Sequence, residues 1–141
     1  LMGTTERVSV DSTGAQGIRP SYLMGISADG RFVAMDSASE NFYPPGTAPE
    51  FPFLLLQVFI HDRATGRTEI ASVNAYGIPG NAHSGDQTYG NALSGDGRFV
   101  AFSSDATNLV VGDTNDRSDV FRAPNPLFWD APAPVPPLDV N

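Results

Sequence analysis

The stretch SADGRFVAM, residues 27–35, recurs as SGDGRFVAF at residues 94–102. When 27–42 is aligned with 94–109, nine of sixteen residues are identical. Two further matches follow the same chain order: GTTERVSV (3–10) matches GRTEIASV (66–73) at five of eight positions, and Val58-Phe59 matches Val120-Phe121. Three collinear matches with slightly different offsets indicate one repeated unit that carries insertions in its loops.

Each copy of the unit predicts β-strands joined by turns. The segments RFVAMDS and QVFIHDR are rich in residues that favour strands, and ADG and ATG supply the glycine that a tight turn requires. Residues 22–73 therefore predict four antiparallel strands, in LMGIS, RFVAMDS, QVFIHDR and RTEIASV. No window shows sustained helical periodicity, so we expect an all-β chain made of β-propeller blades.

The same residues carry a resemblance to a known family. ISADGRFVAMDS, LSGDGRFVAFSSDATNLVVGDTNDRSDVF and VFIHDRATGRTEIASV resemble the TolB-like (WD-like, PD-type) bacterial β-propeller repeats, from residue 3 to about residue 127. The resemblance implies a propeller of roughly six to eight blades in a secreted, periplasmic or cell-surface bacterial protein. It does not imply one activity, because such propellers include binding scaffolds, peptidase-associated domains and lyases.

The predicted strands amount to two blades. They comprise a last strand over 4–10, a full blade over 22–73, and a blade over 89–123 that lacks its own last strand. Because propellers close with about four blades or more, two blades do not form a ring alone. We expect Thr4–Val10 to complete the Tyr89–Arg122 blade of a neighbouring copy, so that three copies form a six-bladed ring. The alternative is that the chain is a fragment of a longer propeller.

The composition disfavours several classes of partner. Sixteen acidic residues against eight Lys and Arg give a net charge of −8, which disfavours nucleic acids and anionic membranes. The chain has no cysteine, and its longest apolar run, FPFLLL, is too short to span a bilayer. No signal peptide is visible, and the chain begins within a repeat motif. The proline-rich tail 128–141 is expected to form a polyproline linker or a terminus, with Phe128-Trp129 anchoring it on the propeller side.

Differences between the copies point to the functional end of the unit. In an antiparallel blade, the loop after the second strand and the loop after the fourth strand share one end, and both loops differ in length between the copies. Variable loops on a rigid scaffold commonly carry binding. We therefore expect recognition of a ligand or a protein through 42–56, 74–90 and 105–119.

Aromatic side chains are the candidate ligand-binding residues of this face. They are Phe42, Tyr43, Phe51, Phe53 and Tyr89. Apolar side chains of this size are costly to leave in water. They form either a lid that packs on its own blade or on a neighbouring subunit, or a groove for an apolar or sugar-like ligand.

A second hypothesis is a small hydrolase or lyase whose active site forms in the closed ring. His83, Ser84 and Asp86 supply the residue types of a nucleophile, a base and an orienting group, and His61 is a further candidate. The loop lacks the G-x-S-x-G elbow, and three neighbouring residues rarely form a relay. The alternative is a polar turn, with His61 an ordinary hydrogen-bonded histidine.

The acidic loop 105–119 is the candidate metal site. Asp113, Asn115 and Asp119, with Asp116 nearby, offer the hard oxygen ligands that Ca²⁺ prefers. The loop lacks the glycine and the final glutamate of the EF-hand pattern. The alternative is that these side chains cap turns through Asx hydrogen bonds. No other cofactor is expected.

Overall fold

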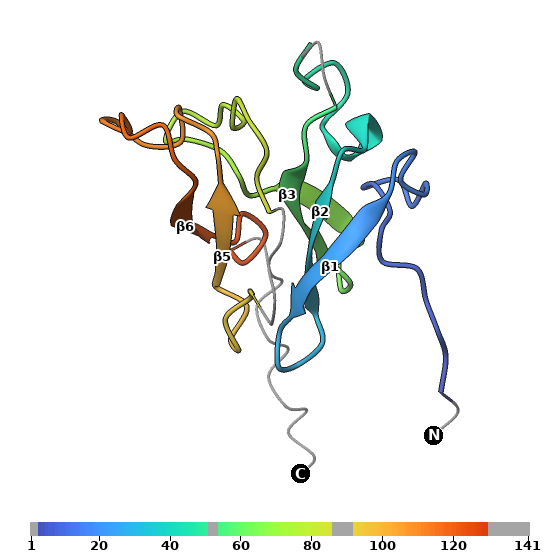
Figure 1. Ribbon diagram of the computed structural model, residues 1–141. Coiled ribbons are helices and arrows are strands. Elements are labelled where there is room, and N and C mark those ends of the chain that lie inside the picture. Colours follow the sequence, from blue (N-terminus) through green and yellow to red (C-terminus); the bar gives the residue numbers. More distant parts are fainter. Residues whose placement is uncertain (1–2, 51–53, 86–91, 130–141) are drawn as a thin grey trace.

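The computed structural model describes residues 3–50, 54–85 and 92–129. In this part of the chain the regular structure consists of six β-strands and one short 3₁₀ turn, η1 (Glu40–Phe42). The fold is all-β, as predicted, and contains two antiparallel sheets (Figure 1). No helix among the described residues has the length and apolar character required to cross a bilayer.

The first sheet contains the four strands expected from the first copy of the unit. They are β1 (Ser21–Ile26), β2 (Phe32–Ser37), β3 (Gln57–Asp62) and β4 (Arg67–Ile70), hydrogen-bonded in the order β1-β2-β3-β4. The last strand ends three residues earlier than predicted. The Ala71 N–H still donates to the Val58 carbonyl at 2.7 Å, but the Ser72 hydroxyl then takes over by accepting from the Val58 N–H at 3.0 Å.

The second sheet pairs β5 (Phe99–Ser104) with β6 (Asp119–Pro124). The first strand expected in this copy is represented in the described residues by one isolated bridge, between Leu93 and Val100. Thr4–Val10 forms no strand, and only Val10 makes a bridge, with Gln16. The expected partner of this segment lies in another copy, so its pairing stays a prediction.

The quoted motif forms the same turn in both sheets. The Ser27 hydroxyl donates to the Asp29 carboxylate at 2.6 Å and accepts from the Phe32 N–H at 3.0 Å, while Gly30 adopts φ 72°. In the second copy the Ser94 hydroxyl donates to the Asp96 carboxylate at 2.7 Å and accepts from the Phe99 N–H at 3.0 Å, and Gly97 adopts φ 77°. The repeated letters therefore encode a turn that satisfies its own polar groups.

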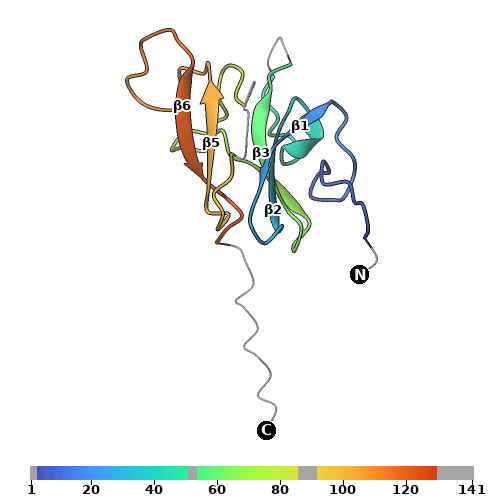
Figure 2. The same ribbon diagram turned by 60° about the horizontal axis from the view of Figure 1, so that its bottom comes forward.

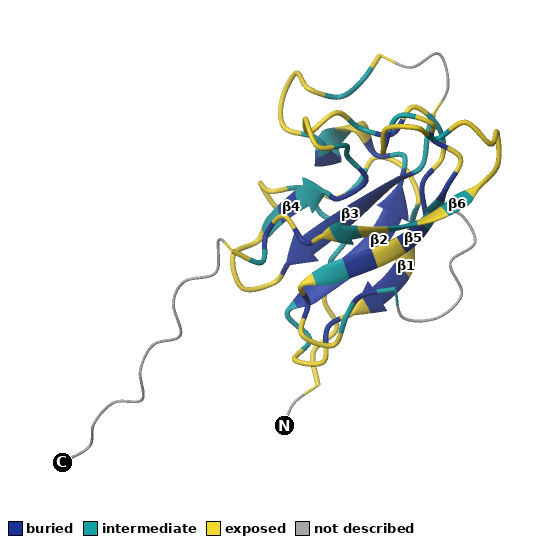
Figure 3. Ribbon diagram, turned by 90° about the vertical axis from the view of Figure 1, so that its left-hand side faces the viewer, coloured by how far each residue is buried: buried dark blue, intermediate teal, exposed yellow. Residues whose placement is uncertain are grey.

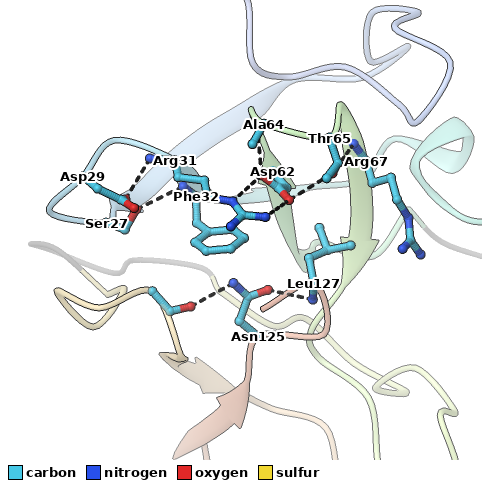
Figure 4. A network of polar contacts seen from close by, with 11 residues as sticks. Ser27, Asp29, Arg31, Phe32, Asp62, Ala64, Thr65, Arg67, Asn125 and Leu127 are labelled. Carbon is cyan, nitrogen blue, oxygen red and sulfur yellow. Dashed lines mark hydrogen bonds and ion pairs between the residues drawn. The ribbon is translucent and has the colours of Figure 1, made fainter. Parts of the chain in front are cut away.

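The main core lies between the two sheets, which pack side by side (Figures 1 and 2). Phe32 from the first sheet meets the turn of the second sheet at Gly97. Leu127, just after β6, is fully buried there, and Asn125 holds this segment by donating to the Gly97 carbonyl at 2.8 Å and accepting from the Leu127 N–H at 2.9 Å (Figure 4). The remaining buried members of this core are Met24, Ala34, Val58, Ile60, Ala71, Leu93, Val100, Phe102, Ala106 and Leu109.

A smaller core covers the other face of the first sheet. Phe42 of η1 and Tyr43 each pack edge-on against Phe59, with ring centroids 5.3 and 5.2 Å apart. Every residue of β2 and β3 is consequently buried, because each of these strands is covered on both faces (Figure 3). Exposed residues concentrate in the loops.

An ion pair between the partly exposed Arg31 and the buried Asp62 links the first turn to β3. Arg31 donates two hydrogen bonds to the Asp62 carboxylate, at 2.9 and 2.7 Å (Figure 4). Burial alone would raise the pKa of Asp62, but hydrogen bonds from Arg31, Ala64 and Thr65 outweigh it and lower that pKa. In the second sheet Pro124 takes the place of Asp62, so the equivalent Arg98 lies beside Asp96 at 3.6 Å and over the rings of Phe128 and Trp129.

Gly97→Ala is expected to destabilise the protein more than Gly30→Ala. Both glycines have positive φ, which costs a residue with a Cβ about 1 to 2 kcal/mol. At Gly97 the added Cβ would also lie 2.5 Å from the Phe32 ring, which adds about 1 to 3 kcal/mol of overpacking, whereas at Gly30 the nearest atom is 3.5 Å away. Urea unfolding of both variants measures the difference. Equal losses would contradict the tight approach of the two sheets.

Arg31→Ala is expected to lower the free energy of unfolding by about 3 to 5 kcal/mol, because it leaves the buried Asp62 carboxylate without its cation. Arg98→Ala is the matched control, since its own ion pair is half exposed and contributes about 1 kcal/mol or less. Chemical denaturation compares the two variants. Similar losses in both would show that the Arg31 pair has no special structural role.

Candidate binding site at the loop end

The long loops of both sheets gather at one end of the molecule. In Figure 1 the described parts of 42–56, 74–90 and 105–119 lie in the upper half, and the two tight turns at 27–31 and 94–98 lie at the bottom. This arrangement follows from the antiparallel order of the strands, because alternate connections leave a sheet at the same end. We call the upper end the loop end.

Hydrogen bonds of the His83 ring and of the neighbouring backbone tie the three loops together. The His83 ring nitrogen Nδ1 accepts from the Leu56 N–H at 3.1 Å, and the Ser84 N–H donates to the Leu56 carbonyl at 2.8 Å. On the other side the His83 carbonyl accepts from the Asp105 N–H at 3.0 Å. Segments far apart in the sequence are thereby held against one another at the loop end.

Asn108 adds a second set of links that the sequence reasoning missed. Its side chain donates to the Pro79 carbonyl at 2.9 Å and accepts from the Asn81 N–H at 2.9 Å, and its own carbonyl accepts from the Asn74 amide at 3.3 Å. Asn41 makes the equivalent contacts to the Gln16 carbonyl and the Ile18 N–H. The signal was present in the sequence, because Asn41 and Asn108 align in the repeat.

The candidate catalytic residues do not form a relay in the described structure. The Ser84 hydroxyl is buried and bonds to the Ser104 hydroxyl at 2.8 Å, as Ser21 bonds to Ser37 in the first copy. His83 is exposed, and its Nδ1 is occupied by the Leu56 N–H. Asp86 lies outside the described residues. Ser84 and His83 therefore act here as structural links between loops.

His61 lies away from the loop end, on β3, and is 6% exposed. Its Nδ1 is 2.9 Å from the Thr68 hydroxyl, which itself donates to the Val10 carbonyl at 2.6 Å. Since the threonine proton is used on Val10, the Nδ1 atom of His61 must donate. Burial lowers the pKa of His61, despite the nearby Asp62 and Glu6 carboxylates. The neutral histidine thus connects the sheet to the N-terminal segment.

Of the candidate ligand-binding aromatics, Phe42 is 2% exposed and belongs to the smaller core. Its burial fits the alternative of a lid that packs on its own sheet, while Phe42 and Tyr43 also line a cavity of about 310 Å³. Tyr43 is half-buried, and burial raises the pKa of its hydroxyl to about 12. Phe51, Phe53 and Tyr89 lie outside the described residues.

The acidic loop is closed by its own hydrogen bonds. The Asn115 side-chain Nδ2 donates to the Asp119 carboxylate at 2.9 Å, and the Asn115 side-chain Oδ1 accepts from the Arg117 N–H at 2.9 Å. Asp116 adopts φ 52° in this turn. The described residues contain no group of three or more His, Cys, Asp or Glu side chains arranged to hold a metal ion. Calcium binding by Asp113, Asn115 and Asp119 stays a prediction from the sequence.

The loop end carries exposed apolar side chains, as the outer strand β1 also does at Tyr22 and Leu23. Tyr76 is 87% exposed and Val111 is fully exposed, and their neighbours Ile78 and Val110 are more than half exposed. Tyr76 and Ile78 lie in the loop 74–90, where Asn74 accepts from both of their N–H groups. The Asn74 side-chain amide also donates to the Asn108 carbonyl in the loop 105–119, which carries Val110 and Val111. We call Tyr76, Ile78, Val110 and Val111 the apolar loop set. From the sequence these positions are predicted only as parts of the loops 74–90 and 105–119.

Acidification between about pH 7 and pH 5 is expected to destabilise the wild type more than His61→Gln. The pKa of His61 is lowered in the folded state from 6.5, so the unfolded chain binds more protons below that value. The stabilisation from neutral His61 is therefore complete above pH 6.5 and is lost as the pH falls towards the folded pKa. Thermal unfolding across this window measures it. Parallel curves for the two proteins would contradict the assignment.

Comparisons of the chain with protein-family models, with curated proteins and with solved structures found no match. The resemblance to TolB-like propeller repeats therefore remains a hypothesis that rests on the sequence motifs.

Proposed function

We propose that this chain is a non-catalytic binding module that recognises a ligand or a protein through the loop end. In this proposal the two sheets are consecutive blades of a TolB-like β-propeller, and the module works outside the cytoplasm, as that resemblance implies. Two features of the described structure support the scaffold: two packed antiparallel sheets, and long loops gathered at one end.

The observation that carries the proposal is a difference between two loops with the same backbone. Asp11 and Asn74 each accept two N–H groups, from residues two and four positions later, and so form the same Asx turn. The exposed positions of this turn are Thr13 and Ala15 in the first copy and Tyr76 and Ile78 in the second. The turn forms with either pair, so large exposed apolar residues are not needed for folding.

An exposed group of large apolar side chains on a rigid support is typical of an interaction site. Neighbouring peptide groups and the hydroxyl of Tyr76 would add hydrogen bonds at its border. The opposite end of the molecule is a poorer candidate, because its turns are nearly identical in both copies and use their serine and aspartate side chains internally. The apolar loop set thus favours a partner with apolar or aromatic groups.

The test is a selection from a random peptide library on the immobilised chain, followed by affinity measurements with the variant Tyr76→Ser/Val111→Ser. Peptides that bind the wild type are expected to lose about tenfold or more in affinity, equivalent to about 1.4 kcal/mol. Thr13→Ser is the matched control in the equivalent turn of the first copy and should leave affinity unchanged.

Peptides that bind the wild type and the double variant equally would place recognition elsewhere on the chain. A separate screen with chromogenic esters and glycosides addresses the hydrolase hypothesis. Turnover that disappears in a folded His83→Ala variant would replace the binding module with an enzyme.

A further inference from the structure

The outer edge of β6 is open in the described structure. β6 pairs with β5 on one side, and no described residue of this chain pairs with it on the other. In the first sheet the equivalent strand, β3, carries β4 on that side. An exposed edge presents unpaired N–H and C=O groups and readily accepts a further strand. Val120, at the start of this edge, is 78% exposed.

A cavity of about 360 Å³ adjoins this open edge. It is lined on the β6 side by Ala123, Pro124 and Pro126, and on the side of the first sheet by Ile70, Ala71, Val73, Asn74 and Ala75. At the corresponding place in the first copy, Thr68 of β4 donates its hydroxyl to the Val10 carbonyl. In the alignment of 3–10 with 66–73, Val10 corresponds to Val73, which lines the cavity. The cavity therefore lies where a fourth strand of the second sheet would place a threonine.

The segment Thr4–Val10 has the sequence of such a strand. It matches β4 and the residues after it at five of eight positions when 3–10 is aligned with 66–73. Side-chain contacts hold it in place: Glu6 pairs with Arg63, and Arg7 donates to Gln16 at 2.7 Å. Residues 3–9 lie in no strand, and residues 3–7 are exposed. The segment thus carries strand residues outside any strand, and within its own chain its last two carbonyls accept from the Gly17 N–H and the Thr68 hydroxyl.

Within one chain the segment and the open edge lie at opposite ends of the molecule. In Figures 1 and 2 residues 3–10 run along the side of the first sheet that faces away from the second sheet. β6 lies at the far side of the second sheet. Pairing between them therefore requires two chains. A contact between different surfaces of identical chains produces a ring when its rotation closes.

We propose that Thr4–Val10 of one copy adds to the outer edge of β6 of a second copy, and that three copies close into a ring of six sheets. The register follows from the first sheet, where Ile60 lies opposite Glu69 and His61 lies opposite Thr68. The repeat alignment then places Glu6 opposite Arg122 and Thr5 opposite Ala123. Opposite charges facing each other across two strands stabilise the pair.

This register also satisfies polar groups beyond the charged pair. In the first sheet the Ser72 hydroxyl accepts from the Val58 N–H at 3.0 Å and donates to the Gln57 side chain at 2.6 Å. Ser9 corresponds to Ser72, and Val120 and Asp119 correspond to Val58 and Gln57. Ser9 therefore accepts from the Val120 N–H and donates to the Asp119 carboxylate. Thr5 enters the cavity and donates to the Val73 carbonyl, as Thr68 does to Val10.

The first test is the mass of the 141-residue chain by sedimentation at micromolar concentration. We expect three times the chain mass of 15.0 kDa. Arg122→Glu is expected to shift this mass towards a single chain, because it places two carboxylates opposite each other. Arg117→Glu makes the same charge change at an exposed position before β6 and should keep the wild-type mass. A single-chain mass for the wild type would overturn the proposal.

The second test is a register-specific disulfide, which the absence of native cysteine makes simple to interpret. In the double variant Thr5→Cys/Ala123→Cys the two side chains lie directly opposite, within the reach of a disulfide, so oxidation should link chains together. In Thr4→Cys/Ala123→Cys the two side chains lie on opposite faces and should not link. Equal crosslinking in the two variants on a non-reducing gel would overturn the proposed pairing, whatever the outcome of the peptide-binding experiment.

Discussion

The packing of the second sheet on the first is the constraint on which the rest of the described structure depends. A sheet of two strands is marginal in water, so β5 and β6 need an apolar surface to cover one face. That surface is provided by β2 and β3, with Phe32 against the backbone of Gly97 and the fully buried Leu127 filling the space beyond. The two sheets approach so closely at this contact that a side chain in place of Gly97 would collide with the Phe32 ring.

Hydrogen bonds from short polar side chains set the geometry around this core. Serine pairs, Ser21 with Ser37 and Ser84 with Ser104, lie at equivalent places in the two copies. Asn41 and Asn108 bind the loops in the same manner. Buried polar groups of this kind are expensive unless satisfied, so each pair admits one arrangement of the chain around it. The two copies consequently keep the same backbone where their apolar residues have diverged.

The residues that hold the backbone are different from the residues that vary between the two copies. The turn at one end is the same in both copies because its serine, aspartate and glycine each satisfy a local requirement. At the loop end the side chains of Asn74 and Asn108 hold the backbone. The side chains of Tyr76 and Val111 are exposed and lie outside the core. A module built in this way can change what it binds without changing how it folds. That is the physical basis of the proposed function.

The sequence by itself determined the four strands of the first sheet and their order, the two strands of the second sheet and the repeated turn, since each depends on local propensity and on residues close together in the chain. It also determined which end of the molecule carries the variable loops. Only the tertiary structure decided the roles of Phe42, Ser84 and His61, because burial depends on what packs against a side chain from distant segments. Phe42 fills a core, Ser84 bonds to Ser104, and His61 bonds to Thr68. The hydrogen bonds of Asn108 join loops that lie about 30 residues apart in the chain. The exposed position of Tyr76 likewise depends on how these loops are placed. Sequence spacing does not reveal how far apart in space such segments lie.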